Sequence, residues 1–143
     1  MAREAVLRDN KILISRRYAC ASATAITKGA GLFLTPDGLV SSAYYINPAS
    51  YAFVGFAHAD KDASDGATSI TADKGAVYDL CPGGPILMGA KVQLIGGNFV
   101  VPASEDATSA IAGAGSYAII IGHALEHAAA SSAISPINVE VYP

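Results

Sequence analysis

The sequence contains no tryptophan, only 8% aromatic residues and only 15% charged residues. Its apolar content is 52%, much of it alanine, so Ser, Thr, Asn and Ala must form a large part of the surface. A chain this poor in charge often covers part of its surface in an assembly. At 143 residues it is long enough to form one domain around its own core.

Long apolar runs are also missing. No stretch of 18 apolar residues occurs, and the N-terminal MAREAVLRDNKILISRR lacks the apolar core of a signal peptide. We therefore expect no membrane contact and synthesis in a cytoplasm. Cys20 and Cys81 form no C-x-x-C pair, and we expect them to be buried thiols.

The usual cofactor motifs are absent. There is no P-loop, no G-x-G-x-x-G and no G-x-S-x-G in the chain. The segment ADKDASDG resembles the opening of a calcium loop, but Asp65 comes one position late and no glutamate follows at the bidentate position. We expect a solvated acidic loop and no cofactor.

One motif suggests zinc. His123, Glu126 and His127 spell H-x-x-E-H, in which two histidines on one helix bind Zn²⁺ and the glutamate acts as a general base. However, three consecutive β-branched residues and Gly122 precede His123, which predicts a strand and not a helix. We predict no metal ligand and no catalytic residue, and a small zinc metalloenzyme is the enzyme alternative.

Charge is distributed unevenly along the chain. Five basic and two acidic residues give the first 17 positions a net charge of +3, while the remainder carries −6. The remainder offers neither a basic face nor an aromatic platform, so we expect no nucleic-acid binding. We predict that residues 1–17 are a basic arm that contacts a neighbouring subunit or an acidic surface. Its candidate interface residues are Arg3, Val6, Leu7, Arg8, Lys11, Ile12, Leu13, Ile14, Arg16 and Arg17.

The remainder has the pattern of β structure. Short segments rich in Val, Ile, Tyr and Phe alternate with Gly, Pro, Asp and Asn clusters, which favour hairpins at Pro36-Asp37-Gly38 and Gly96-Gly97-Asn98. We predict an all-β fold, a small β-barrel or sandwich over residues 18–143, with the arm extended and with one short helix at 104–115, for which a flexible loop is the alternative. The expected strands lie within 32–46, 50–57, 75–80, 90–103, 116–125 and 136–142.

A weak internal repeat is present. Residues 50–57 and 116–124 each begin S-Y-A, continue through an apolar strand, and reach a V/I-G-x-A step. A stretch of small residues and a further strand follow in both cases. This similarity predicts two related strand–loop–strand units in one barrel.

The order of several segments resembles the capsid decoration, or cement, proteins of tailed bacteriophages. The resemblance covers about residues 26–142 and rests on KGAGLFLTPDG (28–38), DKGAVYDL (73–80), ILMGAKVQLIGGNFVV (86–101) and IIGHALEHAAASSAISPINVEV (120–141). The chain has Ala90 where an aspartate is usual in that family.

The resemblance implies a structural virion protein and not an enzyme. Such a protein binds the major capsid protein on the outer surface of an icosahedral head, commonly as a homotrimer, and stabilises the head after expansion. The virion would be its location after synthesis in the host cytoplasm. A small-ligand-binding β module is the third alternative.

Overall fold

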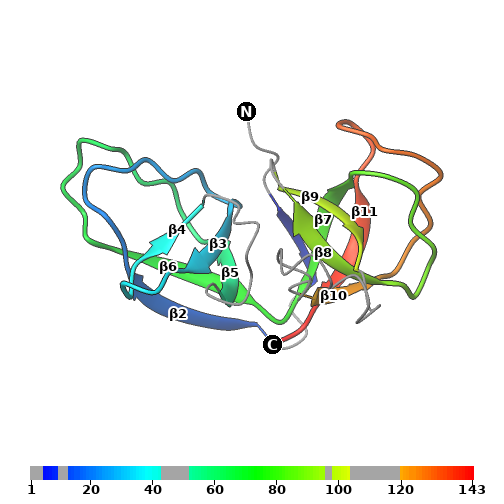
Figure 1. The fold of residues 1–143 in the computed structure, drawn as a ribbon, viewed down its shortest axis with the longest axis horizontal. Coiled ribbons are helices and arrows are strands. Elements are labelled where there is room, and N and C mark those ends of the chain that lie inside the picture. The colour runs from blue at the N-terminus through cyan, green and yellow to red at the C-terminus, as the bar shows by residue number, and fades with distance from the viewer. Residues whose placement is uncertain (1–4, 10–12, 43–51, 96–97, 104–119) are drawn as a thin grey trace.

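The computed structural model describes residues 5–9, 13–42, 52–95, 98–103 and 120–143 (Figure 1). These ranges contain eleven strands and no helix, so the predicted all-β class is confirmed. The helix predicted at 104–115 lies outside the described residues. In the ranges described, no helix has the length and apolar character that a membrane crossing requires.

The strands form two lobes that lie side by side in Figure 1. Lobe 1 contains β2 (Ile14–Ala19), β3 (Gly31–Leu34), β4 (Val40–Ser41), β5 (Ala52–Ala57) and β6 (Ser69–Lys74). Lobe 2 contains β7 (Val77–Pro82), β8 (Lys91–Ile95), β9 (Phe99–Pro102), β10 (Ile120–Ala124) and β11 (Ile137–Val141), and β1 (Val6–Asp9) joins its sheet.

The two lobes have the same topology. Lobe 1 orders its strands β2-β6-β5-β3-β4, and lobe 2 orders its corresponding strands β7-β11-β10-β8-β9. In each lobe a parallel contact joins the two ends of this strand order. In lobe 1 it links Cys20, directly after β2, to Val40 of β4, and in lobe 2 it links Pro82 of β7 to Val100 of β9. This contact closes the five strands of lobe 2 into a small barrel and brings lobe 1 close to closure.

The cores of the two lobes share a set of equivalent positions. Inward-facing side chains alternate along the strands, as expected for half-buried β structure. The lobe 1 core residues Ile26, Leu32, Val40, Val54 and Ile70 correspond to Ile86, Val92, Val100, Ile121 and Ile137 in lobe 2. The internal repeat is therefore confirmed, but the prediction of one shared barrel is wrong, because each unit pairs its strands within its own sheet.

Both predicted hairpins are confirmed. Leu34 pairs with Val40 across the β3–β4 turn, and Ile95 pairs with Phe99 across the β8–β9 turn. Gly38 and Asn98 hold the left-handed conformation in these turns, with φ of 84° and 66°. Asparagine adopts this conformation more readily than most other residues that have side chains.

Asn98 also joins the two lobes. Its Oδ1 accepts a hydrogen bond from Gly31 N–H at 2.8 Å, and its Nδ2 donates one to the Gly29 carbonyl at 2.7 Å. The ring of Phe56 in lobe 1 also contacts that of Tyr78 in lobe 2, with 4.7 Å between their centroids. The junction therefore combines aromatic packing with two buried hydrogen bonds.

The predicted arm forms two strands within the same chain. β1 pairs with β7, and β2 pairs with β6 along its whole length. The predicted division after residue 17 therefore falls inside β2. The N–H of Ala5 donates to the Gly29 carbonyl at 2.8 Å, which also attaches β1 to lobe 1.

Candidate functional site

The most exposed apolar side chains of the described chain lie on the loops of lobe 2. Leu87 and Met88, between β7 and β8, are each 69% exposed, and Ile134, between β10 and β11, is 86% exposed. Ile86 and Ala128 bridge these two loops through paired backbone hydrogen bonds of 2.8 and 2.9 Å. The loops lie on the flank of lobe 2 that faces away from lobe 1 (Figure 1). We call Leu87 and Met88 the apolar tip.

A hollow of about 460 Å³ lies beside the apolar tip. Its wall is mostly apolar and includes Pro85, Leu87, Pro102 and Ala129, and His127 is the one ionisable residue among the described residues that line it. A projecting apolar tip next to a shallow apolar hollow is a shape that a complementary protein surface can cover.

The internal repeat indicates that the fold does not require this tip. Ile26-Thr27-Lys28-Gly29 in lobe 1 and Ile86–Gly89 in lobe 2 form the same turn, closed by hydrogen bonds of 3.0 Å from Ala30 to Thr27 and from Ala90 to Leu87. Gly29 and Gly89 take nearly equal φ values of 83° and 85°. Lobe 1 places Thr27 and Lys28 where lobe 2 places the apolar tip. The turn therefore also forms with polar residues, and folding alone does not explain why Leu87 and Met88 are apolar.

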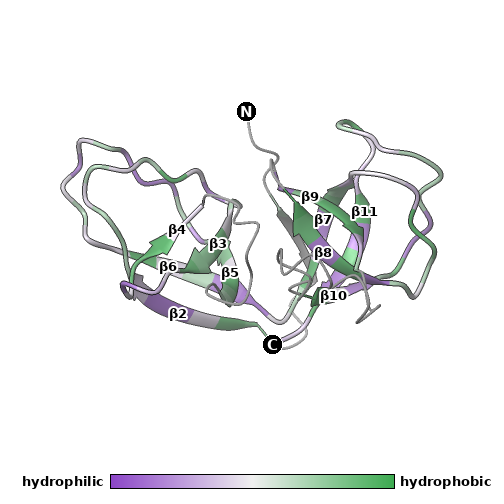
Figure 2. Ribbon diagram, in the orientation of Figure 1, coloured by the Kyte–Doolittle hydropathy of each residue, from purple (hydrophilic) through white to green (hydrophobic). Residues whose placement is uncertain are grey.

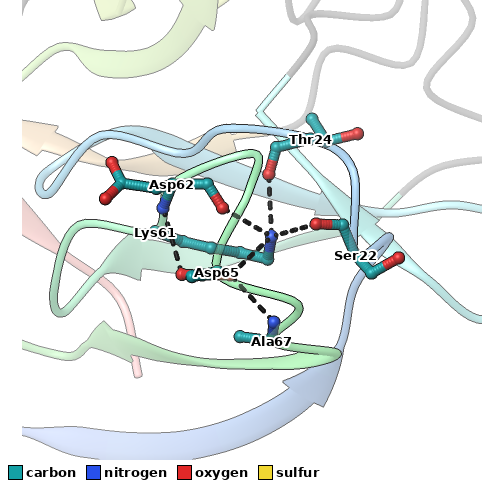
Figure 3. Close-up of polar contacts among 6 residues, drawn as sticks. All are labelled: Ser22, Thr24, Lys61, Asp62, Asp65 and Ala67. Atoms are coloured by element: carbon teal, nitrogen blue, oxygen red, sulfur yellow. Dashed lines mark hydrogen bonds and ion pairs between the residues drawn. The ribbon is translucent and has the colours of Figure 1, made fainter.

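The acidic loop of lobe 1 is built around a buried lysine (Figure 3). Lys61 is only 4% exposed, and its Nζ donates to the carbonyls of Ser22 at 2.8 Å and Thr24 at 3.0 Å. It also lies 3.5 Å from Oδ1 of Asp65. The ammonium group thus holds the two long loops of lobe 1 together.

Asp62 and Asp65 are exposed, so the predicted solvated acidic loop is confirmed. Asp65 accepts N–H bonds from Ala67 at 2.8 Å and from Asp62 at 3.1 Å. The Ala67 bond is the main cause that lowers the pKa of Asp65 below its usual value. The burial of Lys61 could not be read from the sequence, since lysine is rarely buried.

The H-x-x-E-H residues do not converge. His123 lies in β10, as the sequence predicted, and its Nε2 is 3.3 Å from Glu140 on β11. Glu126 accepts the N–H of Asn138 at 2.7 Å, and His127 faces the hollow of the apolar tip. Among the described residues, no group of three or more His, Cys, Asp or Glu is arranged to hold a metal ion.

A larger hollow, of about 610 Å³, lies at the junction of the lobes. Phe56 and Tyr78 contribute rings to its wall, and His58 and Asp73 stand at it with a 2.6 Å contact between Nδ1 and Oδ2. The hydroxyl of Tyr78 has no hydrogen-bond partner among the residues that the structure describes. Burial, with Asp73 as a second cause, raises the pKa of Tyr78, so this hydroxyl stays protonated.

The predicted arm residues are only partly described. Val6, Leu7 and Arg8 lie in β1, while Arg3, Lys11 and Ile12 fall outside the described residues. Leu13 is 37% exposed, and Arg16 and Arg17 are exposed on β2. The contact of these residues with a neighbouring subunit stays a prediction. The predicted buried thiols are confirmed, since Cys20 and Cys81 are free and buried.

The sequence analysis did not predict the apolar tip, because one or two apolar residues in a turn are common in soluble proteins. The signal that identifies it is the comparison of the repeats, which aligns T-K-G-A with L-M-G-A. No protein family, curated protein or solved structure matches this chain.

Proposed function

We propose that this protein is a capsid decoration protein that binds the outer surface of an icosahedral viral head through the apolar tip of lobe 2. Its partner in this proposal is the major capsid protein, it acts as a homotrimer, and it has no catalytic role. The order of sequence segments that resembles phage cement proteins supports the class of protein.

The apolar tip carries the proposal. Burying a Leu or Met side chain stabilises a complex by about 1.5–3 kcal/mol relative to leaving the side chain in water. Leu87 and Met88 are 69% exposed, in a turn that the same chain also builds from Thr27 and Lys28. Binding to a large protein surface gives these two residues a role that folding does not.

The test replaces the tip by its counterpart from lobe 1, with the double variant Leu87→Thr, Met88→Lys. Empty expanded heads are assembled from the major capsid protein of the same genome, and binding is measured by cosedimentation. We expect the variant to bind at least tenfold more weakly, about 1.4 kcal/mol, because the apolar contact is lost.

The matched control is the reciprocal variant Thr27→Leu, Lys28→Met, which alters the equivalent turn of lobe 1. It should bind heads as the unaltered protein does. Unchanged head binding by the lobe 2 variant, with its melting temperature preserved, would show that the tip is not the contact.

A small-ligand-binding module is the second candidate, and the junction hollow favours it. Its volume of about 610 Å³ lies in the range of small-molecule sites, and its mostly apolar wall includes a few polar groups. Ligand-observed NMR with a set of small aromatic amines tests this function. Weaker amine binding by the variant Thr27→Trp, which adds a bulky side chain at an exposed position of the wall, would support it. The absence of any saturable binding would exclude these ligands.

A further inference from the structure

β1 fills an edge of lobe 2. The N–H of Val141 donates to the Ala76 carbonyl at 2.9 Å, so alternate residues of β7, starting from Ala76, direct their backbone groups toward β11. Val77 and Asp79 point the other way, and there they pair with Asp9 and Val6 of β1. The first half of β7 therefore has a strand on both sides.

β2 is the counterpart of β7 in lobe 1. Tyr18 pairs with Ile70 as Leu80 pairs with Ile137, and the two isoleucines hold matching core positions. Counting back from these pairs, Arg17 corresponds to Asp79. By the same register, Arg16 corresponds to Tyr78, and Ser15 to Val77.

This stretch of β2 lacks the outer strand that β7 has. The N–H of Cys20 donates to Thr68 beside β6, so the backbone groups of Ser15 and Arg17 point away from β6. β2 is the edge strand of its sheet: β4 reaches its outer side only at the Cys20–Val40 bridge, and no strand in the described ranges pairs with the outer side of Ser15–Arg17. Figure 1 shows β2 at the margin of lobe 1, and Figure 2 shows that it is largely hydrophilic.

The charges of the exposed arginines on this edge indicate what kind of strand could bind there. Ser15, Arg16 and Arg17 are exposed, and neither arginine forms an ion pair with a described residue. The two arginines point to opposite faces because strand side chains alternate. A strand with acidic residues at two adjacent positions would place one carboxylate opposite each arginine.

A second copy of β1 does not fit this requirement. In the register seen on β7, it would place Val6 opposite Arg17 and Leu7 opposite Arg16. Neither pair is complementary in charge. The edge therefore favours a strand from a different protein.

We propose that the outer edge of β2 at Ser15–Arg17 binds an extended acidic strand of a partner protein by β-strand addition. The main-chain N–H and C=O groups of Ser15 and Arg17 would provide the backbone hydrogen bonds, and the two arginines would select the sequence. This edge is separate from the apolar tip, so the proposal does not depend on capsid binding.

Two peptides test it on the full-length protein. They are acetylated TVEEVTV and its basic counterpart TVKKVTV, each with a fluorescent label, and binding is followed by anisotropy. We expect the acidic peptide to bind at least tenfold more tightly. The double variant Arg16→Glu, Arg17→Glu should reverse this preference. Equal binding of both peptides, or a preference that the variant leaves unchanged, would overturn the proposal.

Amide hydrogen exchange locates the bound strand. In the free protein, the amides of Ser15 and Arg17 should exchange rapidly, and the acidic peptide should slow both at least tenfold. Protection of these amides without peptide that grows with protein concentration would assign the edge to a second copy and overturn the proposal. Binding without added protection at these amides would also overturn it.

A proline variant tests the backbone contribution. Arg17→Pro removes the outward N–H but no hydrogen bond to β6, so an edge strand can accept it. We expect it to bind TVEEVTV at least tenfold more weakly than Arg17→Ala, which lacks the same charge. If Arg17→Pro does not fold, two TVEEVTV peptides, each N-methylated at the alternate amides of one of its two edges, are compared with the parent peptide on the unaltered protein. If both bind as tightly as the parent peptide, strand addition is excluded.

Discussion

At the scale of single residues, Lys61 shows how a charged group can be buried when its donors are fully used. Its ammonium group has three N–H donors, and carbonyls of Ser22, Thr24 and Asp62 lie 2.8 to 3.3 Å away. In lobe 2 the matching position is Ala128, which forms the same backbone bridge with Ile86 that Lys61 forms with Ile26. The bridge therefore belongs to the fold, and the lysine is an addition particular to lobe 1.

We predict that Lys61→Met destabilises the protein by at least about 2 kcal/mol, because it leaves these carbonyls without a donor while the side-chain stem still packs. Urea denaturation measures the loss. Lys28→Met, at an exposed position, is the control and should change stability by less than about 0.5 kcal/mol. Equal stability of both variants would mean that water satisfies the loop carbonyls without Lys61.

At the scale of elements, most strands of lobe 2 could be predicted from the sequence because they consist of apolar and β-branched residues. β6 was missed, since Ser69–Lys74 reads SITADK and offers only Ile70 and Ala72 to the core. Its place in the sheet is set by pairing with β2 and β5, which is a long-range effect.

The repeated V/I-G-x-A step also has a physical reason. A Cβ at Gly55 would lie 2.5 Å from the carbonyl oxygen of Asp73, and one at Gly122 would meet the carbonyl oxygen of Glu140. Both lobes therefore need glycine where β5 and β10 cross closely over the next strand. The sequence displayed this repeat, but the separation into two sheets could not be predicted from it, because strand partners are not encoded in local pattern.

β1 is the element whose contribution is easiest to isolate. We predict that deleting residues 1–9 lowers the free energy of unfolding by at least about 2 kcal/mol, since the backbone groups of Val77 and Asp79 lose their partners and each lost hydrogen bond contributes about 1 kcal/mol. Urea denaturation gives the value, and hydrogen exchange at these two amides should accelerate. Deleting residues 1–4 alone serves as the control. An unchanged free energy of unfolding after deletion of residues 1–9 would contradict the prediction.

At the scale of the whole molecule, the contact between the lobes uses different surfaces of two equivalent units. Lobe 1 contributes the turn at Gly29–Gly31 and the ring of Phe56, whereas lobe 2 contributes Asn98 and Tyr78. The residue in lobe 1 that matches Asn98 is Gly38, which has no side chain to repeat the contact. Such a head-to-tail contact is not symmetric. The surface that lobe 1 buries at the junction therefore has a counterpart in lobe 2 that the junction does not bury, and the reverse holds for lobe 1.

Asn98 should therefore decide whether the lobes unfold together. We predict that Asn98→Gly, which copies Gly38 and keeps the left-handed turn accessible, costs about 1–3 kcal/mol, because the buried Gly31 N–H loses its partner and the Gly29 carbonyl keeps only its bond from Ala5. The loss falls on the junction and not on either core. Native-state hydrogen exchange should then report two opening free energies, one for amides of β5 and β6 and another for amides of β10 and β11, where the unaltered protein gives one. Gly38→Asn is the matched control: it adds a side chain at the equivalent turn and should leave a single opening free energy. If Asn98→Gly also unfolds as one unit, aromatic packing of Phe56 on Tyr78 is sufficient to couple the lobes.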